Sequence, residues 1–390
     1  MGARRYCRTG LQGLSVAIFV LLPLSGCAGE SSGGDTQANS TDTAHLTDAN
    51  IQTVNDLIAK EMEDKNLPGV VVGVWTPDEG EYVTAQGTAN LDTGREREPE
   101  DPFRIASITK TFTGTAILQL VDQGQLSKSD TLSTWYPDFP NADQITVDDL
   151  LRMRSGIVDP FDKDFLQMWI ENPTMDFTPE DAIAASAARA DEFQPPNEKT
   201  EYNNLNFVFL QEIIGKVTGN DLGVQIARNI FEPLGMENSL YPTNDQLPGE
   251  LRGYALDTDT NEFEDKTVLN PDVPGGAGAI ISDLSDLRTY ARALCTGVLL
   301  QPETQAARLE AQQMDGEADF IKYGEGIVQI GKFCGHNGTI FGFSSEMFYL
   351  PEEDATILVN VNRLDADDES KSTDLFLGVS KTFFPEYVDW

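Results

Sequence analysis

Residues 103–117 read Phe-Arg-Ile-Ala-Ser-Ile-Thr-Lys-Thr-Phe-Thr-Gly-Thr-Ala-Ile and contain a Ser-x-x-Lys motif, Ser107 to Lys110. The small and apolar residues that follow predict a buried helix. A spacing of three puts the serine hydroxyl and the lysine ammonium on one face of that helix, one turn apart. A desolvated lysine can take the proton of a serine hydroxyl and so activate it. The motif therefore suggests a nucleophilic serine, but Ser-x-x-Lys alone is too common to identify an enzyme.

The chain begins with the features of an export signal. Arg4, Arg5 and Arg8 precede an apolar run over residues 11–24, and Leu-Ser-Gly-Cys ends at Cys27. The run is too short to cross a bilayer comfortably. Its end resembles a bacterial lipobox, which implies that Cys27 becomes the lipidated first residue of the mature protein. The alternative is an ordinary cleaved signal that happens to end near a cysteine.

Residues 28–50 are dominated by Ser, Gly, Thr, Asp, Asn and Gln. They lack the apolar residues that a core needs, so we predict a disordered tether, with His45 as a linker residue. The signal and tether together predict a protein held on the outer face of the cell membrane, or released from it. We expect membrane contact through the lipid anchor only.

The remaining residues, 51–390, are acidic and too many for one comfortable core, so two lobes are expected. The whole chain has 64 acidic and 27 basic residues, a formal net charge of −37. Removal of the signal would make the mature chain more acidic still. Such a surface repels nucleic acid, so we expect no nucleic-acid partner. We also expect a monomer.

The hydrophobic pattern predicts an α/β (α+β) fold. Strands are expected at residues 70–75 and 81–87 and again at 324–330, 339–350 and 355–362. Helices are expected at 51–65, from Ser107 onward, and at 147–154, 179–190, 205–218, 222–231, 283–294 and 375–384. Strands at both ends suggest an antiparallel sheet built from the N- and C-terminal segments. Helices would flank it, with a mostly helical insert at roughly 118–274.

Two further motifs carry chemical groups. Tyr202-Asn203-Asn204 precedes a predicted helix; a tyrosine can transfer protons, and an asparagine can hold an amide through both its donor and its acceptor. His336-Asn337-Gly338-Thr339 enters a predicted strand. A glycine on an edge strand would let a substrate backbone approach, with the Thr339 N–H facing it.

The order and spacing of the three motifs resemble those of penicillin-recognising serine hydrolases. The most similar members are serine D-alanyl-D-alanine carboxypeptidases and class C β-lactamases. The resemblance covers essentially residues 51–384, including 115–130, 145–157, 193–219, 233–236, 275–294 and 335–345. It implies the β-lactamase/transpeptidase-like fold.

The resemblance also implies roles for the matching residues. Ser107 would attack a carbonyl and become acylated, with Lys110 and Tyr202 sharing the proton transfers; which of the two is the base stays open. Asn204 would align the substrate amide. The backbone N–H groups of Ser107 and Thr339 would form the oxyanion hole, an interaction worth about 3 kcal/mol per donor. His336 replaces the lysine of the β-lactamase strand motif, and no cofactor or metal is implied.

Two positions depart from the family pattern. Asn337 stands where carboxypeptidases of the family often have a threonine that helps to hold the terminal carboxylate of the substrate. This departure puts carboxypeptidase specificity in doubt. Met153-Arg154-Ser155-Gly156 replaces a frequent His-Thr-Ser-Gly, a change that we interpret as structural.

Cys295 and Cys334 are the two cysteines outside the signal. An exported protein can join them in one disulfide, which would brace the segment around His336. Two free buried thiols are the alternative, because geometry cannot be read from sequence.

The sequence thus predicts an exported serine hydrolase that works through an acyl-enzyme on Ser107. The preferred function is that of a D-alanyl-D-alanine carboxypeptidase acting on peptidoglycan stem peptides, with β-lactams as acylating ligands. A class C-like β-lactamase and an esterase of small acyl substrates are the enzymic alternatives. A catalytically idle penicillin-binding lipoprotein would be of another class, but no motif residue is lost.

Overall fold

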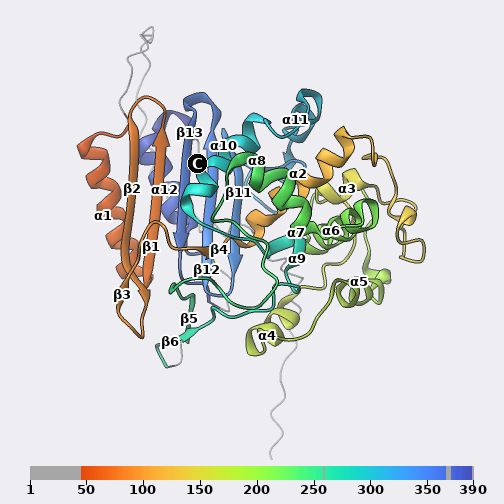
Figure 1. Ribbon diagram of the computed structural model, residues 1–390, viewed down its shortest axis with the longest axis horizontal. Coiled ribbons are helices and arrows are strands. Elements are labelled where there is room, and N and C mark those ends of the chain that lie inside the picture. The colour runs from red at the N-terminus through yellow and green to blue at the C-terminus, as the bar shows by residue number, and fades with distance from the viewer. Residues whose placement is uncertain (1–44, 258–259, 366–369, 389–390) are drawn as a thin grey trace, which may run out of the picture.

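The computed structural model describes residues 45–257, 260–365 and 370–388. The predicted lipidation site, Cys27, and residues 28–44 of the predicted tether lie outside the described residues. A nine-stranded antiparallel sheet forms the centre of the molecule (Figure 1). Its order is β3 (Arg95–Glu96), β2 (Gly80–Asn90), β1 (Gly69–Thr76), β13 (Ala355–Val361), β12 (Phe343–Leu350), β11 (Phe333–Ile340), β10 (Val328–Ile330), β9 (Ile321–Tyr323) and β8 (Gln312–Gln313).

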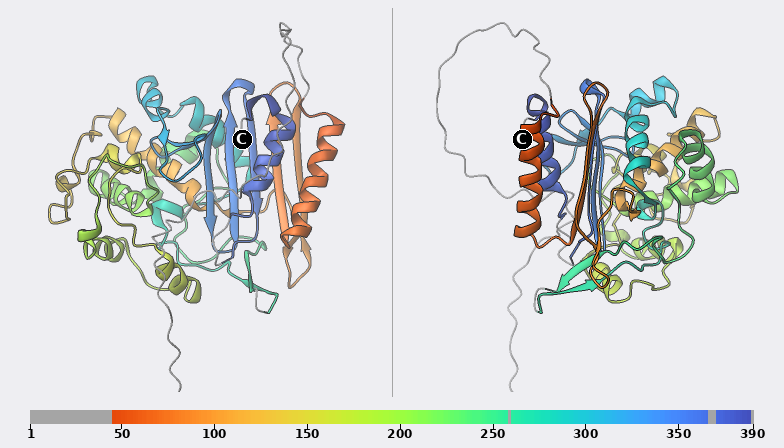
Figure 2. Two further views of the ribbon diagram at one scale, coloured as in Figure 1. Left: turned by 180° about the vertical axis from the view of Figure 1, so that it is seen from behind. Right: turned by 60° about the vertical axis from the view of Figure 1, so that its left-hand side comes forward.

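The sheet joins the two ends of the chain, because β1 pairs with β13. Helices α1 (Asp48–Asp64) and α12 (Thr373–Phe383) pack together on one face, and α10 (Leu284–Thr296) packs against β11, β12 and β13 from the other (Figure 2, right). All eight residues of β1 are buried, as expected for a strand that is covered on both faces. The predicted fold is therefore confirmed.

A helical lobe lies beside the sheet (Figure 1, right). Its centre is α2 (Thr109–Asp122), of which eleven residues are buried, and α2 contacts both α6 (Asn204–Thr218) and α9 (Gly275–Gly278). The other helices are α3 (Val147–Leu151), α4 (Lys163–Glu171), α5 (Pro179–Ala187), α7 (Leu222–Ile226) with a π-helical turn (Ala227–Phe231), α8 (Glu232–Leu234) and α11 (Pro302–Arg308). Two small strand pairs complete the fold: β4 (Phe103–Arg104) with β7 (Ile281–Ser282), and β5 (Tyr254–Asp257) with β6 (Glu262–Asp265).

Two strand predictions were wrong in detail, and in each case a glycine with positive φ explains the difference. Residues 324–327, predicted as part of a strand, form the turn between β9 and β10, where Gly326 has a φ of +71°. The segment 339–350 is not one strand but the end of β11 and all of β12, which are separated at Gly342 with a φ of +82°. The His336 motif therefore lies inside β11 rather than at its entry. Helix α4 was not predicted.

The predicted tether was wrong for residues 45–50. His45 is only 9% exposed, its ring centroid lies 4.8 Å from that of Phe384, and its Nδ1 lies 2.7 Å from the Phe383 carbonyl oxygen. The His45 backbone N–H also donates to the Glu79 carboxylate. Thr47 caps α1, which starts three residues earlier than predicted. These residues are ordered because the aromatic face of His45 buries against the end of α12.

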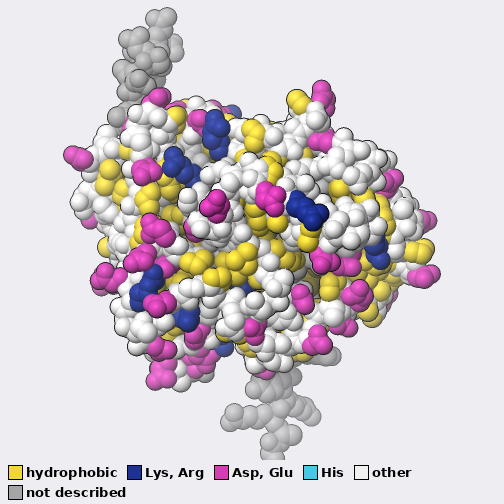
Figure 3. Space-filling view, viewed as in Figure 1, with side chains coloured by type: hydrophobic (Ala, Val, Ile, Leu, Met, Phe, Trp, Pro, Cys, Tyr) yellow, Lys and Arg dark blue, Asp and Glu magenta, His cyan; other side chains and the backbone are white. Residues whose placement is uncertain are grey.

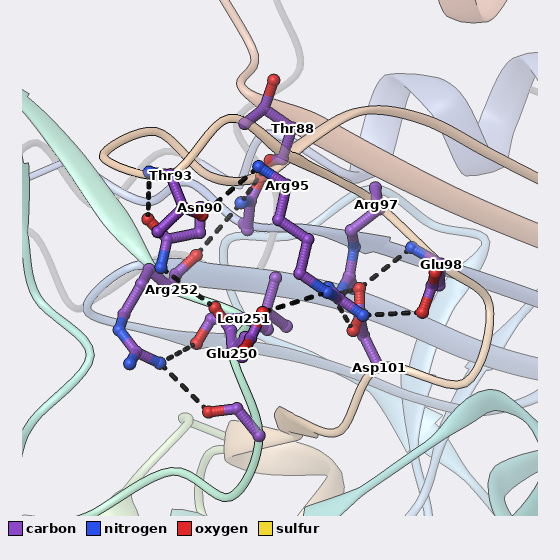
Figure 4. Close-up of polar contacts among 12 residues, drawn as sticks. Thr88, Asn90, Thr93, Arg95, Arg97, Glu98, Asp101, Glu250, Leu251 and Arg252 are labelled. Atoms are coloured by element: carbon purple, nitrogen blue, oxygen red, sulfur yellow. Dashed lines mark hydrogen bonds and ion pairs between the residues drawn. The ribbon is translucent and has the colours of Figure 1, made fainter.

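A cluster of buried charges anchors the segment that leads to Ser107 (Figure 4). The Asp101 carboxylate lies 2.7 Å from Arg95 Nη1 and 3.0 Å from Arg97 Nη1. Arg97 also donates to Asn360 Oδ1 of β13 at 2.5 Å. Burial lowers the pKa of Arg97 to about 10, against the influence of Asp101, so this guanidinium remains charged at neutral pH. The cluster fixes the chain to the sheet just before β4.

The surface is acidic, as the composition requires: carboxylates are scattered over the face in Figure 3, with fewer basic groups among them. Among the described residues, no helix combines the length and the apolar character that crossing a membrane would need.

Candidate active site

Ser107 lies in a short 3₁₀-helix, Ala106–Ile108, directly before α2. Ala106 has a φ of +50°, a conformation that non-glycine residues rarely adopt and that costs roughly 1–3 kcal/mol. The surrounding structure holds this turn in place. The Ile105 N–H donates to the Ile280 carbonyl at 3.0 Å, and the Ile280 N–H donates to Thr109 Oγ1 at 3.1 Å. Such strain, kept by its neighbours, is typical of an active-site serine.

Lys110 is fully buried and forms a direct hydrogen bond with Ser107. Its Nζ lies 2.9 Å from Ser107 Oγ, 2.8 Å from Asn204 Oδ1 and 2.9 Å from the Ala277 carbonyl oxygen. An amide oxygen and a carbonyl oxygen can only accept hydrogen bonds, so they bind two N–H groups of the lysine. In the neutral amine, the lone pair is then left for the Ser107 hydroxyl proton. Burial lowers the pKa of Lys110 to about 7, although Asp159 opposes the shift.

Asn204, the first residue of α6, joins Lys110 to a carboxylate that the sequence did not reveal. The Asn204 N–H donates to Asp159 Oδ2 at 2.7 Å, and its side-chain Nδ2 donates to the same oxygen at 3.0 Å. Burial raises the pKa of Asp159, and hydrogen bonds from Asn204 and Phe161 act against that rise. Ser107, Lys110, Asn204 and Asp159 thus form one continuous hydrogen-bonded chain.

Tyr202 lies against the amine, with Lys110 Nζ 4.8 Å from the centroid of its ring. The tyrosine also lines the cavity described below. The structure therefore brings the three predicted catalytic residues together, and Lys110 forms a direct hydrogen bond with Ser107.

His336 requires a correction, because the structure does not support direct contact with substrate. The side chain is fully buried and is not among the residues that line the cavity. Its Nδ1 lies 2.5 Å from the Asn337 carbonyl oxygen, and its Nε2 lies 3.5 Å from the Tyr323 hydroxyl. Burial, helped by Lys110, lowers the pKa of His336 to about 3. It is therefore a neutral residue packed behind Tyr202, with ring centroids 6.2 Å apart.

β11 brings Asn337, Gly338 and Thr339 to the nucleophile. Only Phe333–Gly335 pair with β10, so the second half of β11 has β12 on one side and the Ser107 turn on the other. A Cβ on Gly338 would lie 2.3 Å from the Ile105 carbonyl oxygen and 3.1 Å from the Ser107 nitrogen. Only glycine permits this approach, which places the strand backbone beside the Ser107 N–H.

Ser107 opens into a cavity of about 870 Å³, counting its open mouth. No Asp, Glu, Lys or Arg is among the described residues that line it. Trp169 and Phe341 form one wall, with their ring centroids 4.7 Å apart. The other described residues that line the cavity are apolar or polar without charge: Ala106, Phe161, Leu166, Tyr202, Asn204, Pro274, Ala277, Gly278, Asn337, Gly338, Thr339, Ile340, Leu364 and Ser370.

Of the two alternatives for the cysteines, the structure has the disulfide. Cys295, in the last turn of α10, is bonded to Cys334 of β11, with Cα atoms 6.1 Å apart. The bridge fixes β11 to α10 two residues before His336.

The departure at residues 153–156 supports the loop that carries Tyr202. The Met153 carbonyl accepts from the Glu201 N–H at 3.0 Å, and Met153 Sδ lies 3.3 Å from the Asn203 nitrogen. Ser155 Oγ donates to Asn206 Oδ1 at 2.6 Å. These contacts agree with the structural interpretation of this segment.

Sequence reasoning missed Asp159, Ala277, Tyr323 and Trp169. Asp159 follows the Ser-Gly-Ile segment, which was noted only for its likeness to the family. Ala277 acts through its backbone, in a Gly-Gly-Ala-Gly run whose small residues allow α9 to lie against α6. Trp169 lies on the unpredicted helix α4.

Three comparisons extend this description. PbpX of Bacillus subtilis (strain 168), which is named as a penicillin-binding protein, is 29% identical over 313 residues, covering 77% of this chain and 73% of that protein. A D-stereospecific amidohydrolase from Streptomyces sp. is 26% identical with a TM-score of 0.74, covering 86% and 98% of the two chains. The D-amino acid amidase of Ochrobactrum anthropi SV3 shares the fold at 23% identity, with a TM-score of 0.77 and coverage of 87% and 99%.

The family model named Beta-lactamase matches residues 54–379, which include every motif residue of the site. Together with the Ser107–Lys110 geometry and the fold, this match identifies the chain as a member of the β-lactamase family of serine hydrolases.

Proposed function

We propose that this protein hydrolyses amide bonds of D-aminoacyl substrates that lack a terminal carboxylate, through an acyl-enzyme on Ser107. The observation that carries the proposal is the hydrogen bond between Ser107 and the buried Lys110, at the floor of a cavity with no charged side chain among its described lining.

In the first half-reaction, Ser107 Oγ attacks the substrate carbonyl carbon while its proton passes to the lone pair of Lys110 Nζ. The oxyanion is held by the backbone N–H groups of Ser107 and Thr339, which the close approach of Gly338 supports. Collapse of the tetrahedral intermediate breaks the C–N bond. The proton gained by Lys110 leaves with the amine, directly or through Tyr202, whose ring lies beside the ammonium.

In the second half-reaction, a water molecule attacks the acyl carbon and gives its proton to Lys110, directly or through the Tyr202 hydroxyl, which passes on its own proton as it receives one. A new C–O bond forms, the bond to Ser107 Oγ breaks, and the serine recovers its proton. The acid product leaves with the former water oxygen. The two half-reactions together consume one water for each amide bond cleaved.

The cavity supports the choice of substrate class. A terminal carboxylate is bound best by an arginine or lysine, and the described lining contains neither. Trp169 and Phe341 instead suit a bulky apolar side chain. The D configuration is taken from the name of the Streptomyces relative, a D-stereospecific amidohydrolase.

A D-alanyl-D-alanine carboxypeptidase is the second candidate, favoured by the likeness to PbpX, which is named as a penicillin-binding protein. Two observations count against it, because its substrate ends in a carboxylate: the described lining of the cavity offers no arginine or lysine, and Asn337 stands at the threonine position. A β-lactamase or an esterase would use the same nucleophile and would differ in the speed of deacylation and in the bond cleaved. An idle binding protein is not favoured, because all five motif side chains are present.

The test is a turnover panel with purified protein: D-phenylalaninamide, L-phenylalaninamide, a D-Ala-D-Ala peptide, nitrocefin and p-nitrophenyl acetate. We expect D-phenylalaninamide to have the highest kcat/KM. A fluorophosphonate should label wild type but not Ser107→Ala, and labelling that persists in this variant refutes the nucleophile. A higher kcat/KM for the D-Ala-D-Ala peptide would favour the carboxypeptidase instead.

We also propose that the protein is exported and held at the membrane surface by lipid on Cys27, on the strength of the N-terminal sequence alone. Cys27→Ala should move the protein from the membrane to the soluble fraction of the producing cell. Unchanged partitioning of this variant would refute the anchor.

A further inference from the structure

Asp159 lies directly behind the catalytic groups, in the loop between α3 and α4. One carboxylate oxygen accepts hydrogen bonds from the Asn204 backbone and side chain at 2.7 and 3.0 Å, and the other accepts from the Phe161 N–H at 3.1 Å. All three groups are N–H donors, so they favour the ionised carboxylate.

We propose that Asp159 is a positioning residue that fixes the orientation of the Asn204 amide and thereby aligns Lys110 for proton transfer. The inference rests on the proposed function, because it matters only if Lys110 takes the proton of Ser107.

The orientation follows from donor and acceptor chemistry. A carboxylate can only accept, so Asp159 requires the Nδ2 side of the Asn204 amide. Oδ1 then faces Lys110 Nζ at 2.8 Å. The opposite orientation would put Nδ2 against the ammonium and Oδ1 against the carboxylate, two repulsive contacts. With Asp159 in place, one Nδ2 hydrogen is taken, and the second stays available for a substrate carbonyl in the cavity that Asn204 lines.

The Asp159 carboxylate is also the negative charge that affects the pKa of Lys110. The other titratable groups around the amine are Tyr202 before α6, Tyr323 of β9 and His336 of β11. Burial keeps both Tyr323 and His336 uncharged at neutral pH. The charge of Asp159 raises the pKa of Lys110 against the effect of burial. Removing this charge should therefore lower the pKa of Lys110.

Asp159→Asn tests the proposal, with Asp162→Asn as the matched control. Asp162 is in the same loop but pairs with Arg189 at 2.9 Å and caps α4, a role that asparagine fills equally well. The measurement is the pH dependence of kcat/KM on the best substrate of the panel, together with the rate at which a fluorophosphonate inactivates each variant.

In Asp159→Asn we expect the acid limb of both profiles to move to lower pH, because a lysine with a lower pKa is neutral at lower pH. The plateau should fall roughly 10- to 100-fold, since a misplaced amide misplaces the reacting groups. Asp159→Glu, which keeps the charge, should keep the midpoint and lose only part of the plateau. Asp162→Asn should match wild type.

An acid limb at the wild-type pH in Asp159→Asn overturns the proposal, as does an equal shift in Asp162→Asn. A merely structural role would lower thermal stability and the plateau without moving the midpoint. If Asp159→Asn does not fold, Asp159→Ser provides the same measurement. A wild-type protein whose Ser107 is not labelled by fluorophosphonate would refute the proposed function itself, whereas a labelled wild type with an unmoved midpoint refutes only the role of Asp159.

Discussion

Two regions near α2 each place a lysine against buried partners, and they treat its charge in different ways: Lys110 is fully buried, whereas the side chain of Lys128 is 27% exposed. Beside the turn between β9 and β10, the fully buried Glu325 carboxylate lies 2.5 Å from Lys128 Nζ and 2.6 Å from Arg152 Nη2. In the active site, Lys110 is buried among neutral partners, and no ion pair formed by the described residues includes it. Asp159 reaches it only through the Asn204 amide.

The difference shows how the fold separates stability from chemistry. The buried Glu325 carboxylate has two direct partners of opposite sign, and these contacts hold elements of the fold together. A buried ammonium whose counter-charge is kept one residue away loses its proton near neutral pH, and this makes it a useful base. One lysine acts as a brace and the other as an acid–base group because their burial and their partners differ, although the residue type is the same.

The same substitution in both regions tests this contrast, and the larger effect is expected at the active site. Lys110→Met should lower kcat/KM roughly 10⁴-fold, because the base is removed while volume is nearly kept. Its thermal stability should stay the same or rise, since a buried amine that forms no ion pair with the described residues is replaced by an apolar chain. Steady-state kinetics and the melting temperature measure the two effects. Activity above a tenth of wild type would show that Tyr202 can serve as the base alone.

Lys128→Met should give the opposite result. Activity should stay near that of wild type, and the free energy of unfolding should fall by about 1–3 kcal/mol, the usual worth of a charge-assisted hydrogen bond. Glu325 would keep Arg152 as a partner, so the fold should survive. Urea unfolding measures the change. A loss of activity as large as that of Lys110→Met would contradict the separation of the two roles.

The sequence predicted that Ser107, Lys110 and Tyr202 lie together, because this depends on residue type, spacing and order. Ser107 and Lys110 needed only a helical spacing to meet, and the distant Tyr202 motif lies beside them as the family likeness implied. The sheet was predictable from strands at both ends of the chain, since β1 and β13 have to pair to bury their apolar faces.

What the sequence could not predict depends on three-dimensional context. Asp159 looks like an ordinary loop carboxylate until Asn204 is placed against it. His336 was expected to contact substrate, yet alternation along β11 turns its side chain inward, toward Tyr323. His45 sits in a polar sequence, and only the end of α12 gives it a surface on which to bury.

The smallest expected effect is on the pH dependence of kcat/KM, and it further tests the difference between Lys110 and Lys128. Because the neutral amine is the base and burial lowers the pKa of Lys110 to about 7, kcat/KM should rise with pH through about 7. Below that pH the rate should fall about tenfold per pH unit, since one proton blocks the base. His336, with a pKa of about 3, should add nothing to this limb. Lys128→Met should keep the midpoint of wild type, because Lys128 pairs with Glu325 outside the site.

The pH dependence of the free energy of unfolding provides an independent check of the pKa of Lys110. Between pH 7 and 10.5 the unfolded chain holds a proton on Lys110 that the folded chain has released, so this group makes stability rise with pH. The difference in unfolding free energy between wild type and Lys110→Met isolates this contribution from that of other titrating groups, such as Glu346 with a pKa of about 8. The advantage of Lys110→Met should therefore be greatest at pH 7 or below and shrink as the pH rises. A difference independent of pH would mean that Lys110 keeps an ordinary pKa in the folded protein, and the acid limb would then need another origin.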